Sequence, residues 1–417
     1  MGDLARTMGM TFGTRSEGIG GRIRSSPEDF VVEEVIDERF LLSLRPEYSE
    51  PSFAVFALTK TGIDSIHAAE LIGQMLRSKV RIMGFKDSKA VTKQYLAVRT
   101  KKSQAMSFTR DRFSLSLLGY TREDFSPRLL LGNRFKIWVR GMEASEEVAR
   151  STLELVSTVF KESGIPNFYG HQRFGSARPV THVVGRCIVH GSLENAVNTF
   201  ITVPSNRDSE EIAEARRLFS EGRLKESLAG FRVKDDIERT IITSLFEKPG
   251  DYLAALRKVS LRVRKLFVAA YSSFIFNKVL SQAIENGQTL HAKEGDVVAE
   301  FDGDYRLGRP SILESVPKQG NRLVPMVPTA GYGYYQKKGR FDLLLHETMK
   351  EEGVMPKMFH IRDAPEMSLE TSLRPAPLLG NSLDYTITGS DVLINFFLVK
   401  GSYATILLRE ITKTEVI

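Results

Sequence analysis

The chain has 417 residues, 42% hydrophobic and 26% charged, so its composition is that of a globular protein and its length predicts two or three domains. Its formal net charge of +7 permits a nucleic-acid partner without requiring one. The single cysteine, Cys187, excludes an intrachain disulfide and a cysteine zinc cluster, which is typical of a reducing cytoplasm. No run of eighteen apolar residues and no apolar N-terminal stretch is present, so we expect neither a membrane span nor a secretory signal.

The first third of the chain predicts short strands that alternate with amphipathic helices. Residues 29–35 and 53–58 are rich in β-branched and aromatic residues, which is typical of strands. Asp64 is a candidate N-cap for a helix that continues to Arg77. The inner face of that helix is expected to hold Ile66, Ala69, Ile72 and Leu76. Further strands are expected at residues 94–98 and 135–139.

The rest of the chain is mostly helical until a strand pattern returns near the C-terminus. Ser145 is predicted to cap a helix through Lys161, with Val148, Leu155 and Val159 on its inner face. The later predictions are charge-rich helices at 193–264, an apolar helix at 263–283, turns with short strands at 295–324, and strands at 384–387 and 392–399. This mixture predicts an α+β fold with a mainly antiparallel sheet.

One carboxylate lies inside the most basic part of the sequence. Between Arg77 and Arg112 there are eleven Lys or Arg residues and two acids, Asp87 and Asp111. A basic run of this kind is the electrostatic signature of a phosphate backbone, and a lone acid works against it. A carboxylate that acts on a nucleotide would explain Asp87. The alternative is that Asp87 caps a turn, which is the commoner role for an isolated aspartate.

Five segments resemble, in the same order, motifs of the TruD family of tRNA pseudouridine synthases. They are 24–34 (RSSPEDFVVEE), 84–94 (GFKDSKAVTKQ), 167–175 (NFYGHQRFG), 273–277 (SFIFN) and 400–410 (KGSYATILLRE). The second resembles the catalytic-aspartate motif, the fourth is a weaker match, and the fifth resembles a C-terminal strand motif. The resemblance covers the chain from about Gly18 to Thr412.

The resemblance implies a discontinuous catalytic domain. The first and last segments would form one pseudouridine synthase domain, interrupted by a mixed, helix-rich TRUD insertion domain. The implied boundaries are a leader at 1–20, a catalytic domain at 21–191 and 373–417, and an insertion at 192–372. Without the resemblance, residues 1–21 would be interpreted as a mobile leader.

The implied activity is the isomerisation of a uridine, U13 of tRNA, to pseudouridine. This reaction breaks the C1′–N1 bond and rejoins uracil to the ribose through C5, so nothing is consumed and no cofactor or metal is expected. The resemblance makes Asp87 the catalytic carboxylate. Whether it attacks C1′ as a nucleophile or removes a ribose proton as a base is left open.

The resemblance also implies roles for residues around Asp87. Arg24 would be the cationic partner that keeps the carboxylate ionised, and its alternative is a surface arginine. Tyr169 stands where relatives commonly have Phe and would stack on the target base, and Asn167 would bond the nearby loop or the nucleotide. Other expected contacts are Lys86, Lys89, Lys93 and Arg173 with phosphates, Tyr403 as a pocket wall or a packed strand aromatic, and Phe174 in the core.

Other classes of function fit less well. The sequence has no phosphate-binding Gly-rich loop, no zinc-ligand spacing and no dinucleotide-binding fingerprint. A non-catalytic RNA-binding or RNA-folding protein on the same scaffold is the second hypothesis, and it would not depend on Asp87. The presence of both Asp87 and Arg24 favours an enzyme with tRNA as its partner. Which tRNAs it modifies, whether other positions are modified, and its oligomeric state stay open.

Overall fold

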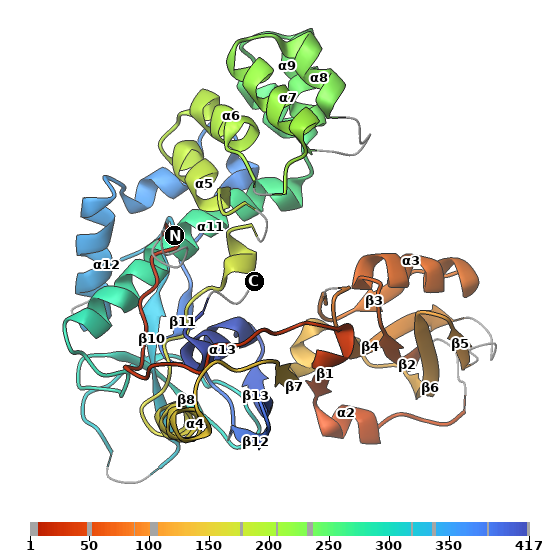
Figure 1. Ribbon diagram of the computed structural model, residues 1–417, viewed down its shortest axis with the longest axis vertical. Helices are drawn as coiled ribbons and strands as arrows, with labels where there is room; N and C mark the ends of the chain where they lie inside the picture. The colour runs from red at the N-terminus through yellow and green to blue at the C-terminus, as the bar shows by residue number, and fades with distance from the viewer. Residues whose placement is uncertain are drawn as a thin grey trace.

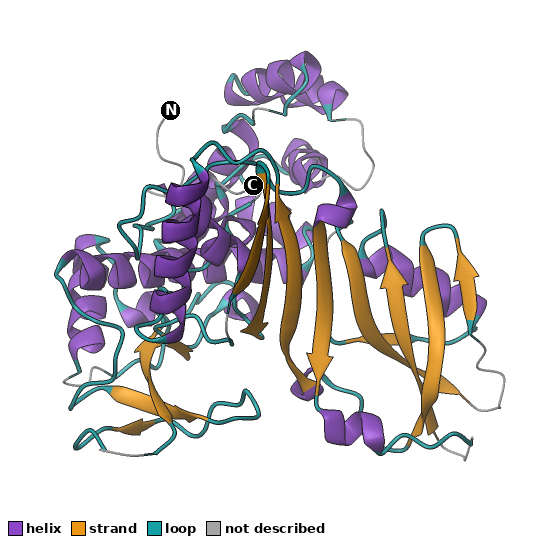
Figure 2. Ribbon diagram, turned by 60° about the horizontal axis from the view of Figure 1, so that its bottom comes forward, coloured by secondary structure: helices purple, strands orange, loops and turns teal. Residues whose placement is uncertain are grey.

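The structure, a computed structural model, describes residues 7–47, 52–86, 88–100, 107–175, 178–205, 207–231, 237–317, 320–335, 339–381 and 383–414. These residues form a mixed fold of helices with one large and one small sheet (Figures 1 and 2). The strands of the large sheet are β1 (Phe30–Ile36), β2 (Ser52–Lys60), β3 (Val80–Ile82), β4 (Val91–Thr100), β5 (Phe108–Arg110), β6 (Phe113–Thr121), β7 (Leu130–Val139), β12 (Asp384–Thr388) and β13 (Asp391–Val399).

The large sheet has nine strands within the described ranges, in the order β12-β13-β7-β1-β4-β2-β6-β5, with β3 paired to β4. Its strand pairs are antiparallel except β1 and β4, which run parallel. Figure 2 shows these strands side by side. The predicted α+β fold with a mainly antiparallel sheet is therefore confirmed, as are the strands expected from the sequence in these regions.

The last strands of the chain lie beside one of the early ones. Residues 392–399 of β13 pair with residues 139–132 of β7, so the first and last parts of the sequence build one sheet. Gly132 lets β7 and β13 approach closely, because a Cβ atom at this position would lie 2.2 Å from the carbonyl oxygen of Leu398. No side chain fits at such a distance, which is a common reason for glycine inside a strand.

Four helices pack with this sheet: α2 (Glu38–Leu42), α3 (Ser65–Met75), α4 (Glu146–Lys161) and α13 (Ala404–Thr412). The predicted caps are confirmed, since Asp64 accepts hydrogen bonds from the first turn of α3 and Ser145 accepts one from Val148. The predicted inner faces are wrong in part. Leu155 and Ile66 are each 43% exposed. The buried side of α4 instead carries Ala149, Thr152, Leu153, Val156 and Phe160.

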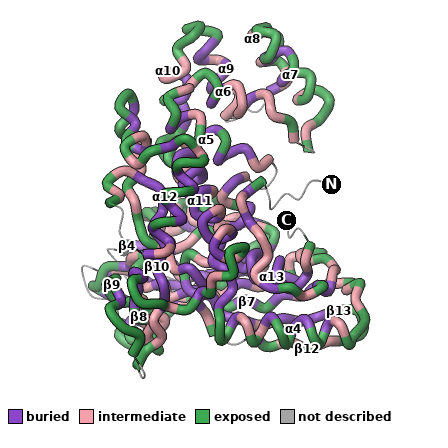
Figure 3. The backbone as a smooth tube through the Cα atoms, turned by 90° about the vertical axis from the view of Figure 1, so that its left-hand side faces the viewer, coloured by how far each residue is buried: buried purple, intermediate pink, exposed green. Residues whose placement is uncertain are grey.

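The remaining helices form the arm at the top of Figure 1 and the region below it. They are α5 (Thr181–Val189), α6 (Leu193–Thr202), α7 (Glu210–Ser220), α8 (Leu224–Gly230), α9 (Ile237–Glu247), α10 (Tyr252–Lys258), α11 (Leu261–Glu285) and α12 (Arg340–Glu351). The small sheet has the order β11-β10-β8-β9, with β8 (Val297–Phe301), β9 (Ser311–Ile312), β10 (Arg322–Pro328) and β11 (Leu373–Pro375). Much of α11 is buried, whereas α7 and α8 show long exposed stretches (Figure 3). No helix in the described ranges is long and apolar enough to cross a membrane.

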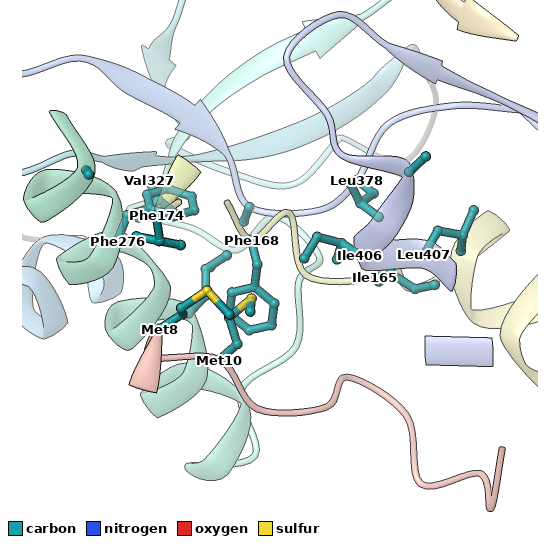
Figure 4. Close-up of a cluster of buried hydrophobic side chains, with 14 of the residues drawn as sticks. Met8, Met10, Ile165, Phe168, Phe174, Phe276, Val327, Leu378, Ile406 and Leu407 are labelled. Carbon is teal, nitrogen blue, oxygen red and sulfur yellow. The ribbon is translucent and has the colours of Figure 1, made fainter. Parts of the chain in front are cut away.

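The N-terminal segment is part of the core in the range that the structure describes. Met8 and Met10 are buried beside Phe168 and α11 (Figure 4). Asn277 on α11 donates a hydrogen bond of 3.0 Å to the carbonyl oxygen of Met8. Residues 7–21 therefore pack against α11 and α13 instead of forming the expected mobile leader. Glu410 of α13 accepts hydrogen bonds from the backbone N–H groups of residues 13 and 14.

A loop after β8 ties the small sheet to the large one. Tyr305 packs against Phe397 of β13 with ring centroids 4.4 Å apart. Ion pairs flank this contact, between Arg306 and Asp37 and between Arg39 and Asp304. These contacts fix the position of the small sheet against the large sheet.

Candidate active site

A pocket of about 370 Å³ lies where four of the five motif segments meet. Its lining residues are Arg24, Phe30, Val32, Phe85, Lys86, Ala90, Thr92, Asn133, Phe135, Tyr169, Gln172, Arg173, Arg374 and residues 401–405. The floor comes from β1, β4 and β7, and the walls come from the loops that carry the motifs. Segments that lie far apart in the sequence therefore converge on one cavity.

A second pocket of about 670 Å³ lies on the opposite face of the same strands. Val32 pairs with Thr92 and Glu33 pairs with Lys93 in the parallel ladder of β1 and β4. Since successive side chains of a strand point to opposite faces, Val32 and Thr92 reach the first pocket while Glu33 and Lys93 reach the second. The second pocket is lined by residues whose charges pair with one another, such as Lys93 with Glu33. Lys93, which was expected to contact phosphate, therefore lies outside the first pocket, whereas Arg24, Tyr169, Arg173 and Tyr403 line it. We therefore place the candidate active site in the first pocket.

The loop that contains Asp87 is anchored on both sides. Asp87 itself lies outside the described residues. Before it, the backbone N–H of Lys86 donates to Ser65 over 2.9 Å. After it, the carbonyl oxygen of Ser88 accepts from Gly62 over 3.1 Å. Lys86, the residue that precedes Asp87 in the sequence, lines the pocket.

The two lysines of this loop have different surroundings. The Lys86 amine lies 3.1 Å from the carboxylate of Glu34, whose side chain is fully buried. That carboxylate also accepts a hydrogen bond of 3.0 Å from the backbone of Tyr95. Lys86 is thus held by an internal ion pair, which the prediction of a phosphate contact did not foresee. Lys89 is exposed and lies outside the residues that line the pocket.

Arg24 lines the pocket and has an unusual backbone. Its guanidinium carbon lies 4.2 Å from the centroid of the Phe30 ring. Its backbone φ angle is +59°, a left-handed conformation that residues other than glycine rarely adopt. Strained residues of this kind cluster at functional sites, where the surrounding structure holds them in place. The interpretation of Arg24 as an ordinary surface arginine is not supported by this position.

Aromatic and cationic side chains form one wall of the pocket. Tyr169 packs edge-to-face with Phe276, at 5.4 Å, and with Tyr403, at 6.1 Å between ring centroids. The guanidinium carbons of Arg173 and Arg374 lie 5.2 Å and 4.1 Å from the centroid of the Tyr169 ring. The segment 273–277 supports this wall. Its last residue, Asn277, accepts a hydrogen bond of 2.8 Å from the backbone N–H of Tyr169 and donates one to the carbonyl oxygen of Tyr169.

Asn167 lies behind this wall and does not line the pocket. It is buried, and its amide donates to the carbonyl oxygen of Pro375 over 3.1 Å. Arg374 donates to its side-chain oxygen over 2.7 Å and to its carbonyl oxygen over 3.1 Å. Asn167 therefore bonds the nearby chain in this structure. Arg374 was not predicted, since it belongs to none of the five motif segments.

Two further expectations concern the last and third motifs. Tyr403 is not on a strand: it precedes α13 in the turn after β13, so the segment 400–410 is a turn and a helix. The strand interpretation was wrong because the buried residues of 404–412 occupy a helix that packs against the N-terminal segment.

Phe174 is fully buried and packs edge-to-face with His182, which confirms its prediction as a core residue.

The lining of the pocket combines cationic side chains with aromatic and aliphatic ones. Four of its lining side chains are cationic: Arg24, Lys86, Arg173 and Arg374. No Asp or Glu is among the lining residues in the described part of the chain. Burial lowers the pKa of the Arg374 guanidinium. Such a pocket suits a nucleotide, whose phosphate is anionic and whose base can stack on a ring.

Comparison with known proteins agrees with this geometry. The sequence profile of the family tRNA pseudouridine synthase D (TruD) matches residues 8–411. A protein of Methanopyrus kandleri described as a probable tRNA pseudouridine synthase D is 37% identical over 89% of this chain and 88% of its own length. One of Methanosarcina acetivorans with the same description is 32% identical over 97% and 95%.

A crystal structure from Methanosarcina mazei, assigned as tRNA pseudouridine synthase D (TruD), superposes with a TM-score of 0.79. The sequences are 30% identical, and the match covers 98% of each chain. The fold and the pocket thus define an isomerase of the pseudouridine synthase class. The chain belongs to the TruD family.

Proposed function

We propose that this protein converts U13 of specific tRNAs to pseudouridine, with Asp87 as its catalytic carboxylate. The observation that carries the proposal is the convergence of the motif segments on one cationic pocket, whose wall includes the residue next to Asp87. A lone carboxylate supplied by this loop would meet cations rather than other acids. Such surroundings favour its ionised form, which either catalytic route requires.

The other site residues have complementary roles in this proposal. Arg24 keeps the Asp87 carboxylate charged and oriented. Tyr169 stacks on the uracil, and Tyr403 supplies the adjoining wall. Asn167 acts through Arg374, which it holds under the Tyr169 ring. Contacts with RNA phosphates are assigned to Lys86, Lys89 and Arg173.

A uridine stacked in a folded tRNA must leave its stack before it can enter such a pocket. Extrusion of one nucleotide costs a few kcal/mol, which stacking on an aromatic ring and phosphate contacts offset. We assign the pocket to a catalytic domain of 21–191 and 373–417, and the second side of the RNA-binding region to an insertion domain of 192–372. We propose a cytoplasmic location for the protein, because tRNA is its expected substrate.

The experiment is pseudouridine mapping on tRNA transcripts by carbodiimide labelling and primer extension. Wild-type protein should modify position 13, and Asp87→Asn should bind the same transcript without modifying it, because it removes a charge and little volume. A transcript with cytidine at position 13 is the control. Binding without any pseudouridine would favour a non-catalytic RNA-binding protein, and turnover by Asp87→Asn would refute the assignment of Asp87.

A further inference from the structure

Among the residues that the structure describes, four buried polar atoms on the pocket lining have no hydrogen-bond partner. They are the hydroxyl oxygens of Thr92 and Thr405, the side-chain oxygen of Asn133 and the Nε of Arg173. Thr92 is fully buried and Thr405 is 6% exposed. Buried polar groups are nearly always paired in folded proteins, so a group of unpaired ones on a single cavity indicates a ligand that pairs with them.

We propose that Asn133, Thr92 and Thr405 bind the polar edge of the uracil. They lie on three separate elements, β7, β4 and the start of α13, around one pocket. Uracil presents two carbonyl oxygens and one N3–H, and an amide with two hydroxyls provides matching donors and acceptors. The proposal rests on the proposed function. It assigns to these three residues the polar edge of the uracil, whereas the aromatic wall contacts the face of the ring.

The chemistry of the reaction explains why hydroxyls suit this position. The C1′–N1 bond breaks, the detached uracil turns, and the C5–C1′ bond forms; C5 then loses its proton and N1 gains one. The base must therefore stay bound while its donors and acceptors change position. A threonine hydroxyl both donates and accepts and can rotate, so it can exchange partners as the base turns.

The test compares Thr92→Val, Thr405→Val and Asn133→Ala with the control Ser52→Ala, which removes another buried, unpaired hydroxyl outside the pocket. We expect each pocket variant to lower the single-turnover rate at saturating tRNA about 10-fold, with tRNA binding and thermal stability unchanged. The threonine variants keep their shape, so a lost rate with an intact melting temperature identifies a contact with substrate.

The outcomes separate this proposal from the proposed function. Rates equal to that of Ser52→Ala would overturn the uracil assignment while leaving the synthase activity intact. If wild-type protein forms no pseudouridine on any RNA, the proposed function fails. Equilibrium dialysis with labelled uracil then decides the assignment, which stands if wild type binds and the pocket variants do not, and is overturned otherwise.

The rim of the pocket carries an independent feature. Phe85 is 57% exposed although the backbone on each side of it is hydrogen-bonded, by Gln94 at Gly84 and by Ser65 at Lys86. The guanidinium carbon of Arg262, near the start of α11, lies 4.2 Å from the centroid of the Phe85 ring. Among the described residues no carboxylate pairs with Arg262. The pair bridges the catalytic loop and α11.

We infer that Phe85 and Arg262 are a clasp for the RNA strand that flanks the extruded uridine. In the free protein the cation covers the ring. When RNA binds, the ring stacks on a neighbouring base and the guanidinium contacts a phosphate, and each new contact is stronger than an exposed cation–π contact. Like the uracil assignment, this inference rests on the proposed function.

Phe85→Ala should lower the single-turnover rate about 10-fold, and Phe85→Trp should restore it, because any large ring can stack. Arg262→Ala should raise KM about 10-fold and reduce the salt dependence of RNA binding by the equivalent of about one phosphate contact. The control is Phe246→Ala, which removes an aromatic side chain that is 49% exposed on α9. Variants that match this control in rate and in salt dependence would overturn the clasp. The salt dependence decides it even if the protein proves to bind RNA without modifying it.

Discussion

Arg374 donates a hydrogen bond of 2.7 Å to the side-chain oxygen of Asn167, although 207 residues separate the two in the sequence. The same guanidinium lies 4.1 Å from the centroid of the Tyr169 ring. Asn167 thus orients the guanidinium of Arg374, which lies against the ring of Tyr169. The stacking surface of the pocket therefore depends on a buried polar contact behind it.

Arg374→Ala is expected to affect stability and activity together. It would leave the buried oxygen of Asn167 unpaired and remove the cation below Tyr169, which should lower the free energy of unfolding by about 2–3 kcal/mol. Denaturant unfolding measures this. The control Arg150→Ala removes an exposed pair with Glu146 and should leave the free energy of unfolding nearly unchanged. Equal effects of the two variants would contradict the structural role of Arg374.

Lys86→Met tests whether Lys86 serves the fold or the RNA. The substitution leaves Glu34 buried without its cation, which should lower the free energy of unfolding by about 3 kcal/mol. In the double variant Lys86→Met with Glu34→Gln, the free energy of unfolding should recover most of this decrease, because the unpaired buried charge is gone. A Lys86→Met protein of normal stability whose RNA binding loses salt dependence would instead support the predicted phosphate contact.

Stability should fall on the acid side because of His182, which stacks on Phe274 with ring centroids 5.0 Å apart. Burial lowers the pKa of His182 to about 4 from its ordinary value of 6.5. The unfolded chain therefore binds a proton at a pH where the folded protein does not. The stabilisation is complete above about pH 6.5 and is lost towards pH 4, a total of about 3 kcal/mol.

His182→Gln should flatten this part of the curve of unfolding free energy against pH. The exposed His67→Gln is the control and should keep the loss between pH 6.5 and 4. An unchanged curve for His182→Gln would show that the imidazole titrates normally in the folded protein.

Two substitutions at Arg24 separate its side chain from its backbone. Arg24→Ala and Arg24→Gly both remove the guanidinium, so both should lose most pseudouridine formation. Glycine adopts a φ of +59° without strain, so Arg24→Gly should be more stable than Arg24→Ala by about 1 kcal/mol. Thermal melts and single-turnover assays check the two effects. Full activity in either variant would make Arg24 a structural residue.

The sequence predicted the strands and helices well where local patterns decide them. Strands rich in β-branched residues and helices with Asp or Ser caps formed near their expected positions, because caps and alternation act over a few residues. The inner face of α4 was misassigned because Val148, Leu155 and Val159 follow a helical spacing almost as regular as that of the buried set. Only the packing of the neighbouring sheet selects between two apolar stripes.

Pocket residues that belong to contiguous sequence motifs were predicted. Pocket residues that only the folded chain brings to the site were missed. Tyr169, Arg173 and Tyr403 reached the pocket as expected, since each motif brings its own turn. Arg374 could not be found, because its partner Asn167 becomes its neighbour only when β11 is in place. The burial of Met8 and Met10 could not be predicted either, since nothing near them in the sequence shows the core cluster that they join.

The place of β13 beside β7 has a consequence for the timing of synthesis. A ribosome that has not yet passed Val399 carries a chain whose main sheet lacks two of its described strands and whose pocket lacks the wall of residues 401–405. The pocket that four motif segments share is therefore completed only by the last residues of the chain, after β13 has been made.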